Sequence, residues 1–397
     1  MKLALFTDTL ADVNGVSRFV NAAGEYAFER SRSMRVFTCT DLPMAARPWV
    51  TNLKPVFASR MPGYANLRFA VPSPGELAAA VCDFAPDVVH VSTPGPVGLL
   101  GRRWAMRNQV PLAGTYHTDF PAYIARLFND EGLGTLTTRI MSWFYRPFEC
   151  VLTRSTAYLG PVRALGVSAD RSVALRFGVD LARFSPMHRD EALLRRLSPG
   201  VGDGPRVLYC GRVSFEKNVR VLASAWRMLE TRWRKHETSP LPALVVVGDG
   251  PALGEIRESL RGCNASMLGF RSGHELSSLI ASCDLLAFPS TTDTLGQSVL
   301  EAQASGLAAV VSHVGGPAEV VVDSQTGVVV RSTAPEAWAH AMYRVLRDPT
   351  LLSSMKRRAC THAEGLDIRD SLEHFWTLNA RLARSTTATS PANVDQA

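Results

Sequence analysis

Short runs of β-branched and other apolar residues alternate with longer amphipathic stretches along most of the chain. This alternation is typical of parallel sheets covered by helices on both faces, and it predicts an α/β protein. In the first half we expect strands at residues 3–7, 36–40, 88–91, 112–116 and 158–160. In the second half we expect them at 206–210, 243–247, 266–268, 285–288, 309–312 and 327–330.

The two sets of strands are separated by residues 198–205, which are dense in Gly and Pro. Such a segment cannot hold a regular element, so we predict an interdomain hinge there. The first domain is then 1–197 and the second 206–365, with a helix near 366–384 that packs back on the first. Residues 385–397 are rich in Ser, Thr, Ala and Asn, and we expect a disordered tail.

Composition narrows the class of protein. The 397 residues are 46% hydrophobic and 20% charged, which excludes a disordered or fibrous chain. The net charge is +7, and only five of the 43 basic residues are lysines. An excess of arginine favours phosphate-bearing or anionic partners. Residues 1–190 carry 21 Lys and Arg against 15 Asp and Glu, so a basic face would belong to the first domain.

The cysteines and the N-terminal residues indicate the cellular compartment of the protein. The seven cysteines show neither CxxC pairs nor metal-ligand spacing, which favours a reducing compartment. Asp8 interrupts the first apolar run, so we interpret that run as a strand rather than a signal peptide. No uncharged apolar stretch approaches the ~18 residues of a membrane span. We therefore expect a cytoplasmic protein.

The first candidate site follows the strand at 206–210. Gly211 and Arg212 come directly after it, and Lys217 follows before the next helix. Ligands of doubly wound sheets lie beyond the carboxyl ends of the strands, where Arg and Lys can hold a diphosphate. The alternative is a solvated loop with two surface cations.

The second candidate site follows the strand at 285–288. Asp293 and Glu301 are eight residues apart, and a helix starting near Thr294 would separate them by about 12 Å along its axis. The backbone amides of Thr294, Leu295 and Gly296 would then face an anionic phosphate. The alternative is an N-cap Asp followed by an exposed helical Glu.

Together these two segments resemble glycosyltransferase family four, whose members are retaining enzymes with the GT-B fold. In that family a G-R-x-x-x-x-K segment, here Gly211 to Lys217, binds the donor diphosphate. An E-x7-E segment grips the sugar and the nucleoside, and here Asp293 replaces its first Glu. The context around Asp293 is similar to a branch with mannosyltransferases and sulfoquinovosyl-diacylglycerol synthases. The resemblance implies two doubly wound, Rossmann-like domains that face each other across a cleft.

Further segments resemble the same family. Gly15 matches a loop glycine close to donor and acceptor, and His117 matches a strand-end histidine beside the donor sugar. Gly248 and Gly250 match a G-D-G-P segment near the nucleoside, and Arg271 a position near the base. Each match has an alternative. Gly15 could be an ordinary turn glycine and His117 a structural histidine. The segment with Gly248 and Gly250 could be a turn that starts a helix, and Arg271 could be a surface arginine.

The resemblance implies a retaining transfer of a hexose, with mannose from GDP-mannose as the leading donor, to a lipid or glycan hydroxyl. Arg212 and Lys217 would stabilise the leaving diphosphate, Asp293 would hold sugar hydroxyls and His117 would orient the sugar. Three alternatives stay open: a UDP-sugar-dependent glucosyl or sulfoquinovosyl transfer to diacylglycerol, a sugar-nucleotide epimerase, and a non-catalytic sugar-nucleotide-binding protein. No D-x-D pair is placed for a metal, so we predict metal-independent activity without a cofactor.

The acceptor is expected on the first domain. Residues 120–148 mix aromatic side chains with arginines, a composition that suits an anionic membrane surface. The alternative is a pair of amphipathic helices packed on the sheet. We therefore expect a protein that associates peripherally with the inner face of the membrane, and no nucleic-acid partner because no recognition motif is present.

Overall fold

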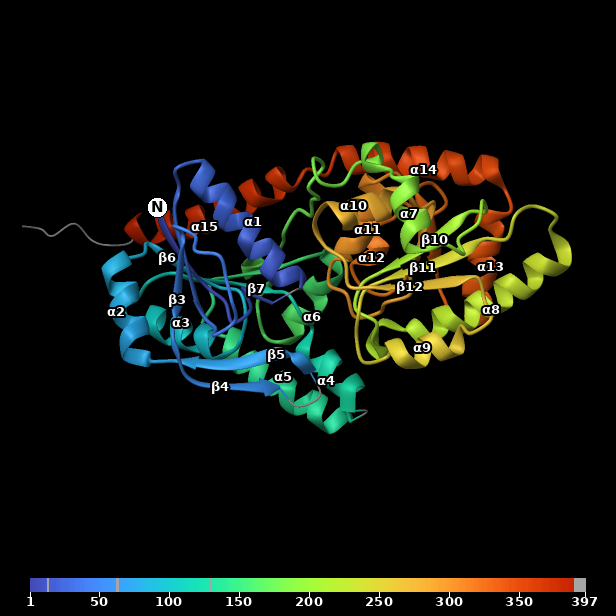
Figure 1. The fold of residues 1–397 in the computed structure, drawn as a ribbon. Helices are drawn as coiled ribbons and strands as arrows, with labels where there is room; N and C mark the ends of the chain where they lie inside the picture. The colour runs from blue at the N-terminus through green and yellow to red at the C-terminus, as the bar shows by residue number, and fades with distance from the viewer. Residues whose placement is uncertain (13, 62–63, 129, 389–397) are drawn as a thin grey trace, which may run out of the picture. The chain divides into compact units, whose positions relative to one another are not determined.

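The computed structural model describes residues 1–12, 14–61, 64–128 and 130–388. The chain forms two compact units, each built on its own parallel sheet (Figure 1). Unit 1 comprises Met1–Arg176 together with Arg369–Ala397, and unit 2 comprises Phe177–Ile368.

Unit 1 contains a seven-stranded sheet in the order β3-β2-β1-β6-β7-β8-β9. All of its pairings are parallel, and the central strands are buried on both faces because helices cover them. The strands are β1 (Lys2–Phe6), β2 (Ser33–Cys39), β3 (Val50–Leu53), β6 (Val88–Val91), β7 (Leu112–Tyr116), β8 (Cys150–Thr153) and β9 (Ser172–Ala174).

Several helices of unit 1 begin at polar caps or prolines. The Asn14 side chain accepts from the Ser17 amide at the start of α1, and Ser73 caps α2 before Pro74. The helices are α1 (Gly15–Glu29), α2 (Pro74–Phe84), α3 (Pro96–Arg107), α4 (Phe120–Phe128), α5 (Glu131–Tyr145) and α6 (Leu159–Ala164).

Several elements of unit 1 differ from the sequence prediction, and among them the strands β3, β8 and β9 were not predicted. The strand predicted at 158–160 is instead a 3-10 turn, Thr156–Tyr158, followed by α6. Pro161 lies in the first turn of α6, where a helix tolerates the missing amide proton. An antiparallel hairpin of β4 (Pro55–Met61) and β5 (Tyr64–Pro72) was not predicted.

Unit 2 contains a six-stranded parallel sheet in the order β12-β11-β10-β13-β14-β15. Its strands are β10 (Arg206–Cys210), β11 (Ala243–Val247), β12 (Ala265–Gly269), β13 (Leu285–Phe288), β14 (Ala308–Ser312) and β15 (Gly327–Val330). Its helices are α7 (Glu191–Leu197), α8 (Val219–His236), α9 (Leu253–Ser259), α10 (Gly273–Ala281), α11 (Gln297–Ala304), α12 (Pro317–Val320), α13 (Pro335–Leu346) and α14 (Pro349–Glu364).

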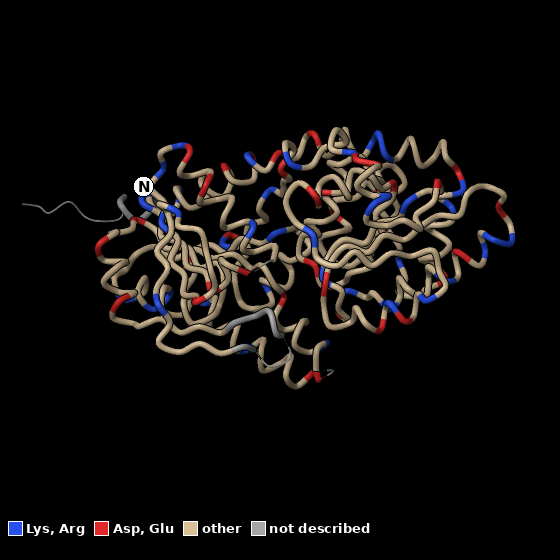
Figure 2. Tube along the Cα trace, in the orientation of Figure 1, with Lys and Arg blue, Asp and Glu red and all other residues tan. Residues whose placement is uncertain are grey.

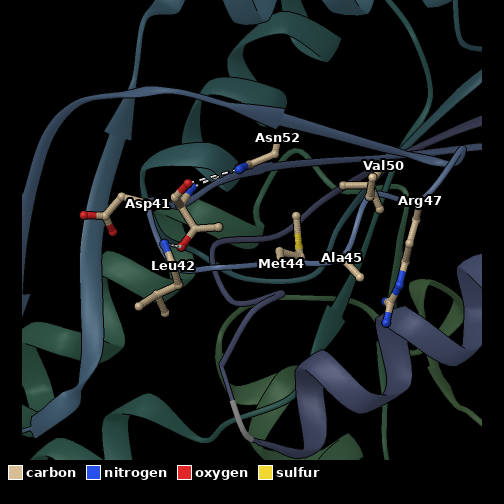
Figure 3. Close-up of a pocket in the computed structure, with 9 residues that line it drawn as sticks. Asp41, Leu42, Met44, Ala45, Arg47, Val50 and Asn52 are labelled. Carbon is tan, nitrogen blue, oxygen red and sulfur yellow. Dashed lines mark hydrogen bonds between the residues drawn. The ribbon is translucent and has the colours of Figure 1, made fainter.

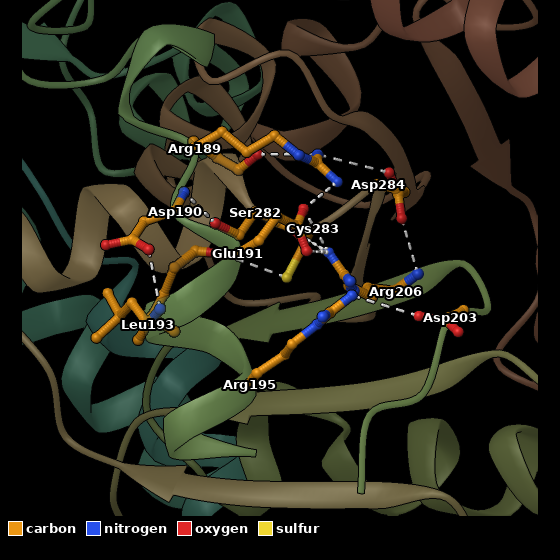
Figure 4. Close-up of polar contacts among 12 residues, drawn as sticks. Arg189, Asp190, Glu191, Leu193, Arg195, Asp203, Arg206, Ser282, Cys283 and Asp284 are labelled. Carbon is orange, nitrogen blue, oxygen red and sulfur yellow. Dashed lines mark hydrogen bonds and ion pairs between the residues drawn. The ribbon is translucent and has the colours of Figure 1, made fainter. Parts of the chain in front are cut away.

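The boundary between the units falls at Phe177, not at the predicted hinge 198–205. The segment before that hinge is held to unit 2 by charged contacts around α7 (Figure 4). Nη1 of the buried Arg206 lies 2.7 Å from Oε2 of Glu191, and the Asp190 amide donates to Ser282 Oγ at 2.8 Å. Val201, within the predicted hinge, is 1% exposed in the core of unit 2. The Gly and Pro residues of 198–205 therefore belong to a loop packed within unit 2 and not to a hinge between the units.

The C-terminal helix α15 (Ile368–Ala388) returns to unit 1, as predicted. Asn379 Oδ1 accepts from His90 at 2.9 Å, and the Phe375 ring packs edge-on against Phe19. Because the helix runs to Ala388, residues 385–388 are helical rather than part of a disordered tail. The remaining tail residues, 389–397, lie outside the described part of the chain.

Charged residues lie mainly on helices and loops, whereas the strands of both sheets are almost free of them (Figure 2). Four of the seven cysteines are buried and Cys82 is exposed, and all seven are free thiols.

Candidate functional site

The first group of candidate residues lies where strand order reverses in the sheet of unit 2. β10 has β11 on one side and β13 on the other, so successive crossovers leave it in opposite directions. Loops at the carboxyl ends of such strands form the usual ligand crevice of doubly wound sheets. The loops after β10 and β13 carry Arg212, Lys217 and Asp293, three of the residues predicted from sequence.

These two loops are tied together through Lys217. Its Nζ lies 2.9 Å from Asp293 Oδ2 and donates to Thr292 Oγ1 at 3.2 Å. Asn218 adopts a left-handed conformation, and its Nδ2 donates to the Pro289 carbonyl at 3.0 Å. The structure therefore brings the predicted clamp lysine and the predicted sugar-binding carboxylate into direct contact.

Arg212 lies in the loop after β10 and is half-buried, and a hydrogen bond from Tyr209 holds its backbone. The Tyr209 hydroxyl donates to the Arg212 carbonyl at 2.6 Å. Burial, and secondarily the charge of Asp293, raises the pKa of Tyr209 well above its usual value. Tyr209 therefore stays a neutral donor that fixes the backbone beside Gly211.

Helix α11 begins three residues later than expected. It runs from Gln297 to Ala304, and Gly296 precedes it with φ +79°. Thr294, Leu295 and Gly296 thus form a loop before the helix, because the left-handed Gly296 interrupts helical geometry. Asp293 lies in that loop as well, so the expected 12 Å axial separation from Glu301 does not apply. Glu301 sits within the helix and is 2% exposed.

Gly248 and Gly250 serve the packing of one loop on another. The loop after β11 lies against the loop after β10, and the Val213 amide donates to the Asp249 carbonyl at 2.9 Å. A Cβ at Gly248 would lie 1.9 Å from the Gly211 carbonyl oxygen, and one at Gly250 would lie 2.3 Å from that of Val213. Backbone packing alone thus explains both glycines, and their nearness to a nucleoside stays a prediction.

Arg271 follows β12, two strands away from β10 in the sheet. Its Nε lies 3.5 Å from Glu275 Oε1, and its Nη1 donates to the Phe270 carbonyl at 2.9 Å. These contacts fit a half-exposed arginine that braces the start of α10. A contact with the base stays a prediction.

The second group of candidate residues lies at the carboxyl edge of the sheet of unit 1. His117 follows β7 directly, and its Nε2 lies 3.0 Å from Ser92 Oγ, which follows β6. Burial, and then the charge of Arg154, holds the pKa of His117 well below its usual value. His117 is therefore a neutral imidazole at pH 7, suited to hydrogen bonding rather than to acting as a cation.

Gly15 is the first residue of α1 rather than part of a loop. A Cβ built at Gly15 would meet nothing within 4 Å, so packing within unit 1 does not require a glycine there. The space in front of this helix start is open, which suits the close approach of a ligand.

The sequence analysis missed three side chains at the edge that carries His117. Asp8, after β1, accepts hydrogen bonds from the Val97 amide at 2.7 Å and from the Gly95 amide at 3.0 Å, and burial raises its pKa to about 6. His90 is buried between Asn379 and Thr115, and burial lowers its pKa to about 4. Arg154, after β8, is buried beside Phe19. Asp8 and Arg154 each stand alone after a strand, so only that position could have pointed to them, whereas His90 lies within β6 and has no such signal.

A pocket of about 430 Å³ opens beside the loop that joins β2 to β3 in the same unit (Figure 3). Met44 and Leu42 give its lining an apolar part, and Asp41, Arg47 and Asn52 give it a polar part. It can hold a small ligand with both apolar and hydroxyl groups.

Within the described part of the chain, no cluster of three or more His, Cys, Asp or Glu side chains could hold a metal ion. Among the described helices, none has the length and apolar character needed to cross a membrane.

Two family models match the chain. Residues 13–183 match the model described as Glycosyltransferase Family 4, and residues 194–362 match the one described as Glycosyl transferases group 1. The two matches follow one another and fall mainly in unit 1 and unit 2, respectively.

Curated relatives carry similar descriptions. A GDP-mannose-dependent alpha-mannosyltransferase of Mycobacterium tuberculosis is 32% identical over 72% of this chain and 72% of its own length. The sulfoquinovosyl transferase SQD2 of Arabidopsis thaliana is 30% identical over 67% of this chain, which spans 50% of that protein.

Solved structures share the fold. Sucrose-phosphate synthase of Thermosynechococcus elongatus has a TM-score of 0.76 at 20% identity, over 98% of this chain and all of its own. Anabaena HepE in complex with UDP and glucose has a TM-score of 0.71 at 18% identity, with the same coverage. At this identity the likeness concerns the fold, and it confirms the predicted architecture of two doubly wound domains.

Proposed function

Because this chain belongs to the glycosyltransferases, with a family 4 region followed by a group 1 region, we propose that it moves mannose from GDP-mannose to a lipid or glycan hydroxyl, with retention of configuration. The observation that carries this proposal is the contact between Lys217 and Asp293 at the reversal of strand order in unit 2. A cation and a carboxylate 2.9 Å apart suit the point where a sugar joins a diphosphate.

The departure of the nucleoside diphosphate limits glycosyl transfer, because negative charge grows on it as the bond to the sugar breaks. Lys217 and Arg212 stabilise that charge, and interactions that strengthen in the transition state accelerate the reaction. Asp293 then accepts hydrogen bonds from sugar hydroxyls beside the same bond. The carboxylate of Asp293 holds the ammonium group of Lys217 in place.

The acceptor binds on unit 1. The C1–O bond to the diphosphate breaks, a C1–O bond to the acceptor oxygen forms on the same face, and the leaving phosphate takes the acceptor's proton. His117 is neutral and bonded to Ser92, so it orients the sugar by hydrogen bonds and is not required as a base. The pocket beside Met44 and Arg47 offers space for the rest of an acceptor (Figure 3).

Thermal-shift measurements with GDP, UDP and ADP test the donor, because a ligand that binds only the native state raises its stability. We expect GDP to protect the protein most, and GDP-mannose to support transfer of labelled mannose. Protection by UDP alone would overturn the assignment of GDP. Nucleotide binding without transfer to any lipid or glycan acceptor would favour a sugar-nucleotide-binding protein.

The second candidate function is transfer from a UDP-sugar, glucosyl or sulfoquinovosyl, to diacylglycerol. The similarity to the sulfoquinovosyl transferase favours it. Labelled UDP-glucose and UDP-sulfoquinovose, each supplied with diacylglycerol vesicles, separate this function from the first.

We also propose that helices α4 and α5 rest on an anionic membrane at its inner face. They pack together, and Gly134 lies against Ala125. Their outer side exposes large apolar side chains next to the exposed Arg126 and Arg139, the combination that binds anionic bilayers. The apolar side chains are Leu127, Phe128, Leu133, Leu136, Ile140 and Trp143.

Flotation with phosphatidylcholine vesicles, with and without phosphatidylglycerol, tests this surface. We expect flotation only with phosphatidylglycerol at low salt, and its loss in the double variant Ile140→Ser, Trp143→Ser. Met187→Ser on unit 2, where Met187 is 89% exposed, is the matched control and should float like wild type. Equal flotation of all three proteins would contradict the proposal.

A further inference from the structure

We propose that Arg154 forms a subsite for an anionic group, a phosphate or carboxylate, on the glycosyl acceptor. The inference rests on the proposed function and specifies the substrate class of its acceptor side. It is carried by an arginine that is buried, incompletely hydrogen-bonded and located at the ligand edge of the sheet of unit 1.

Burial is the first argument. Arg154 is 5% exposed, and its Nη1 is buried without a hydrogen-bond partner among the described residues. A buried charged donor left without an acceptor costs several kcal/mol, so proteins rarely keep one without a purpose. The described structure supplies only part of the compensation, since Cζ of Arg154 lies 4.2 Å from the centre of the Phe19 ring.

Charge is the second argument. Burial alone accounts for the lowered pKa of Arg154, about 10, and no described carboxylate raises it. The side chain is therefore still a cation at pH 7, and it has no acidic partner in the described part of unit 1. Arginine offers a planar fork of donors that matches phosphate and carboxylate oxygens.

Location is the third argument. Arg154 directly follows β8, and His117 directly follows β7, the neighbouring strand. The Phe19 ring contacts both, because its centre also lies 5.8 Å from that of the His117 imidazole. An anion on Arg154 would thus lie beside the histidine at the proposed reaction centre, on the unit that binds the acceptor.

The donor does not need this cation. In the proposed function its diphosphate is held by Arg212 and Lys217 on unit 2, whose loops are already tied together. A second anion-binding arginine on unit 1 therefore fits a negative charge that the acceptor brings. A lipid headgroup and a soluble phosphate ester share this chemistry.

Thermal stability of the full chain in inorganic phosphate tests the subsite without requiring transfer. The measurement is made in an Arg212→Ala, Lys217→Ala background, so that phosphate binding at the donor loops does not contribute. We expect phosphate to raise Tm, and Arg154→Gln to weaken phosphate binding about 10-fold, as the loss of a charge-assisted bond implies. Arg103→Gln, at an exposed position of α3, is the matched control and should bind phosphate as before.

Stability without phosphate separates ligand binding from a structural role. If Arg154 only held the fold together, Arg154→Gln would lower Tm in phosphate-free buffer. We expect Tm there to be unchanged or higher, because the variant removes a buried charge. Arg154→Lys should keep part of the phosphate response. Should Arg154→Gln fail to fold, the side-chain NMR signal of Arg154 in ¹⁵N-arginine protein, assigned with Arg154→Lys, must shift with phosphate.

Two further arms identify the source of the anion: soluble glycerol phosphate, and vesicles of phosphatidylglycerol in phosphatidylcholine. An Arg154-dependent Tm shift with either one supports the subsite and names its source. A phosphate response that Arg154→Gln leaves intact, or the absence of any response in the protein that retains Arg154, overturns the inference. Absence of transfer with normal phosphate binding would count against the proposed function alone.

Discussion

At the scale of single residues, the ammonium group of Lys217 has the most specific surroundings of any candidate. Only five lysines occur among the 43 basic residues. Lys217, in the loop after β10, contacts the carboxylate of Asp293 and the hydroxyl of Thr292, which both lie in the loop after the adjacent strand β13. A compact, mobile ammonium can move from Asp293 to a phosphate oxygen when the donor arrives.

We therefore predict that Lys217→Ala lowers kcat by about 100-fold or more, the usual effect of removing one group that stabilises transition-state charge. Initial rates with GDP-mannose measure it. Lys235→Ala, at an exposed position near the end of α8, is the control and should keep the wild-type rate. Full transfer by the Lys217 variant would remove the lysine from the proposed mechanism.

His90 gives a prediction on stability rather than activity. Its folded pKa is about 4, below the unfolded value of about 6.5, so the unfolded chain binds the proton more readily. The stability that His90 contributes is thus present above pH 6.5 and is lost as pH falls toward 4. By pH 5 the loss is about 2 kcal/mol.

Urea unfolding of wild type and His90→Gln at pH 7 and pH 5 measures this loss. The wild type should lose about 2 kcal/mol more than the variant on acidification. His236→Gln, at an exposed position, is the control and should behave as wild type. If acidification lowered the unfolding free energy of wild type and of His90→Gln equally, His90 would have the same pKa in the folded and unfolded states, which contradicts the prediction.

Arg212, Lys217 and Asp293 could be singled out as candidates from the sequence because they stand in the loops after predicted strands and at spacings known from a family. Arg154 and Asp8 also follow strands, yet each is a single residue without a motif. Their significance comes from contacts with residues distant in sequence, such as the Phe19 ring for Arg154 and the Val97 backbone amide for Asp8. Spacing along the chain contains no information on such contacts.

At the scale of elements, all six strands of the unit 2 sheet were predictable, whereas β3, the buried β8 and β9 of unit 1 were not. β11 is apolar along its whole length and β10 is apolar after its first residue, Arg206, so their positions are clear in the sequence. The short edge strand β9 and the β4–β5 hairpin are not, and Pro55 and Pro72 at the outer ends of the hairpin argue against a central strand. The start of α11 was misplaced because Gly296 turns the chain before the helix.

The loops after β10 and β11 support a prediction about packing. Gly248→Ala places a Cβ 1.9 Å from a carbonyl oxygen at a φ of +139°, so the loop after β10 must move. We expect a loss of about 2 kcal/mol or more in unfolding free energy, together with weaker nucleotide binding.

Gly254→Ala is the control, because Gly254 lies in α9 and a Cβ there meets nothing within 4 Å. Alanine favours helices over glycine, so this variant should be slightly more stable, by up to about 1 kcal/mol. Urea unfolding measures both variants. Equal stability of Gly248→Ala and wild type would contradict the packing argument.

At the scale of the whole molecule, the net charge is distributed unequally between the two units. Unit 1 carries 22 Lys and Arg against 16 Asp and Glu, so nearly all of the +7 belongs to the unit proposed to meet anionic acceptors and lipid. The boundary was misplaced because Gly and Pro suggested a flexible linker. A loop rich in Gly and Pro can equally well be closely packed. The contacts of Glu191 and Val201 show that this loop is packed rather than a flexible linker.

Removal of residues 369–397 tests the dependence of unit 1 on α15. The truncated chain loses Asn379 and Phe375, the partners of His90 and Phe19. We expect fast amide exchange across β6 and β7 with unchanged protection in β10 and β11, measured by hydrogen exchange. Removal of 389–397 alone is the control. Normal protection of β6 in the longer truncation would show that α15 is dispensable.

The return of α15 to unit 1 also has a consequence for the order of synthesis. All of unit 2 is synthesised before residues 369–388 of α15, whereas unit 1 combines residues made before unit 2 with this helix made after it. Domains generally fold as they emerge. Unit 2 can therefore reach its native state before α15 covers the part of unit 1 around His90 and Phe19, and until α15 has been made that part needs protection from aggregation.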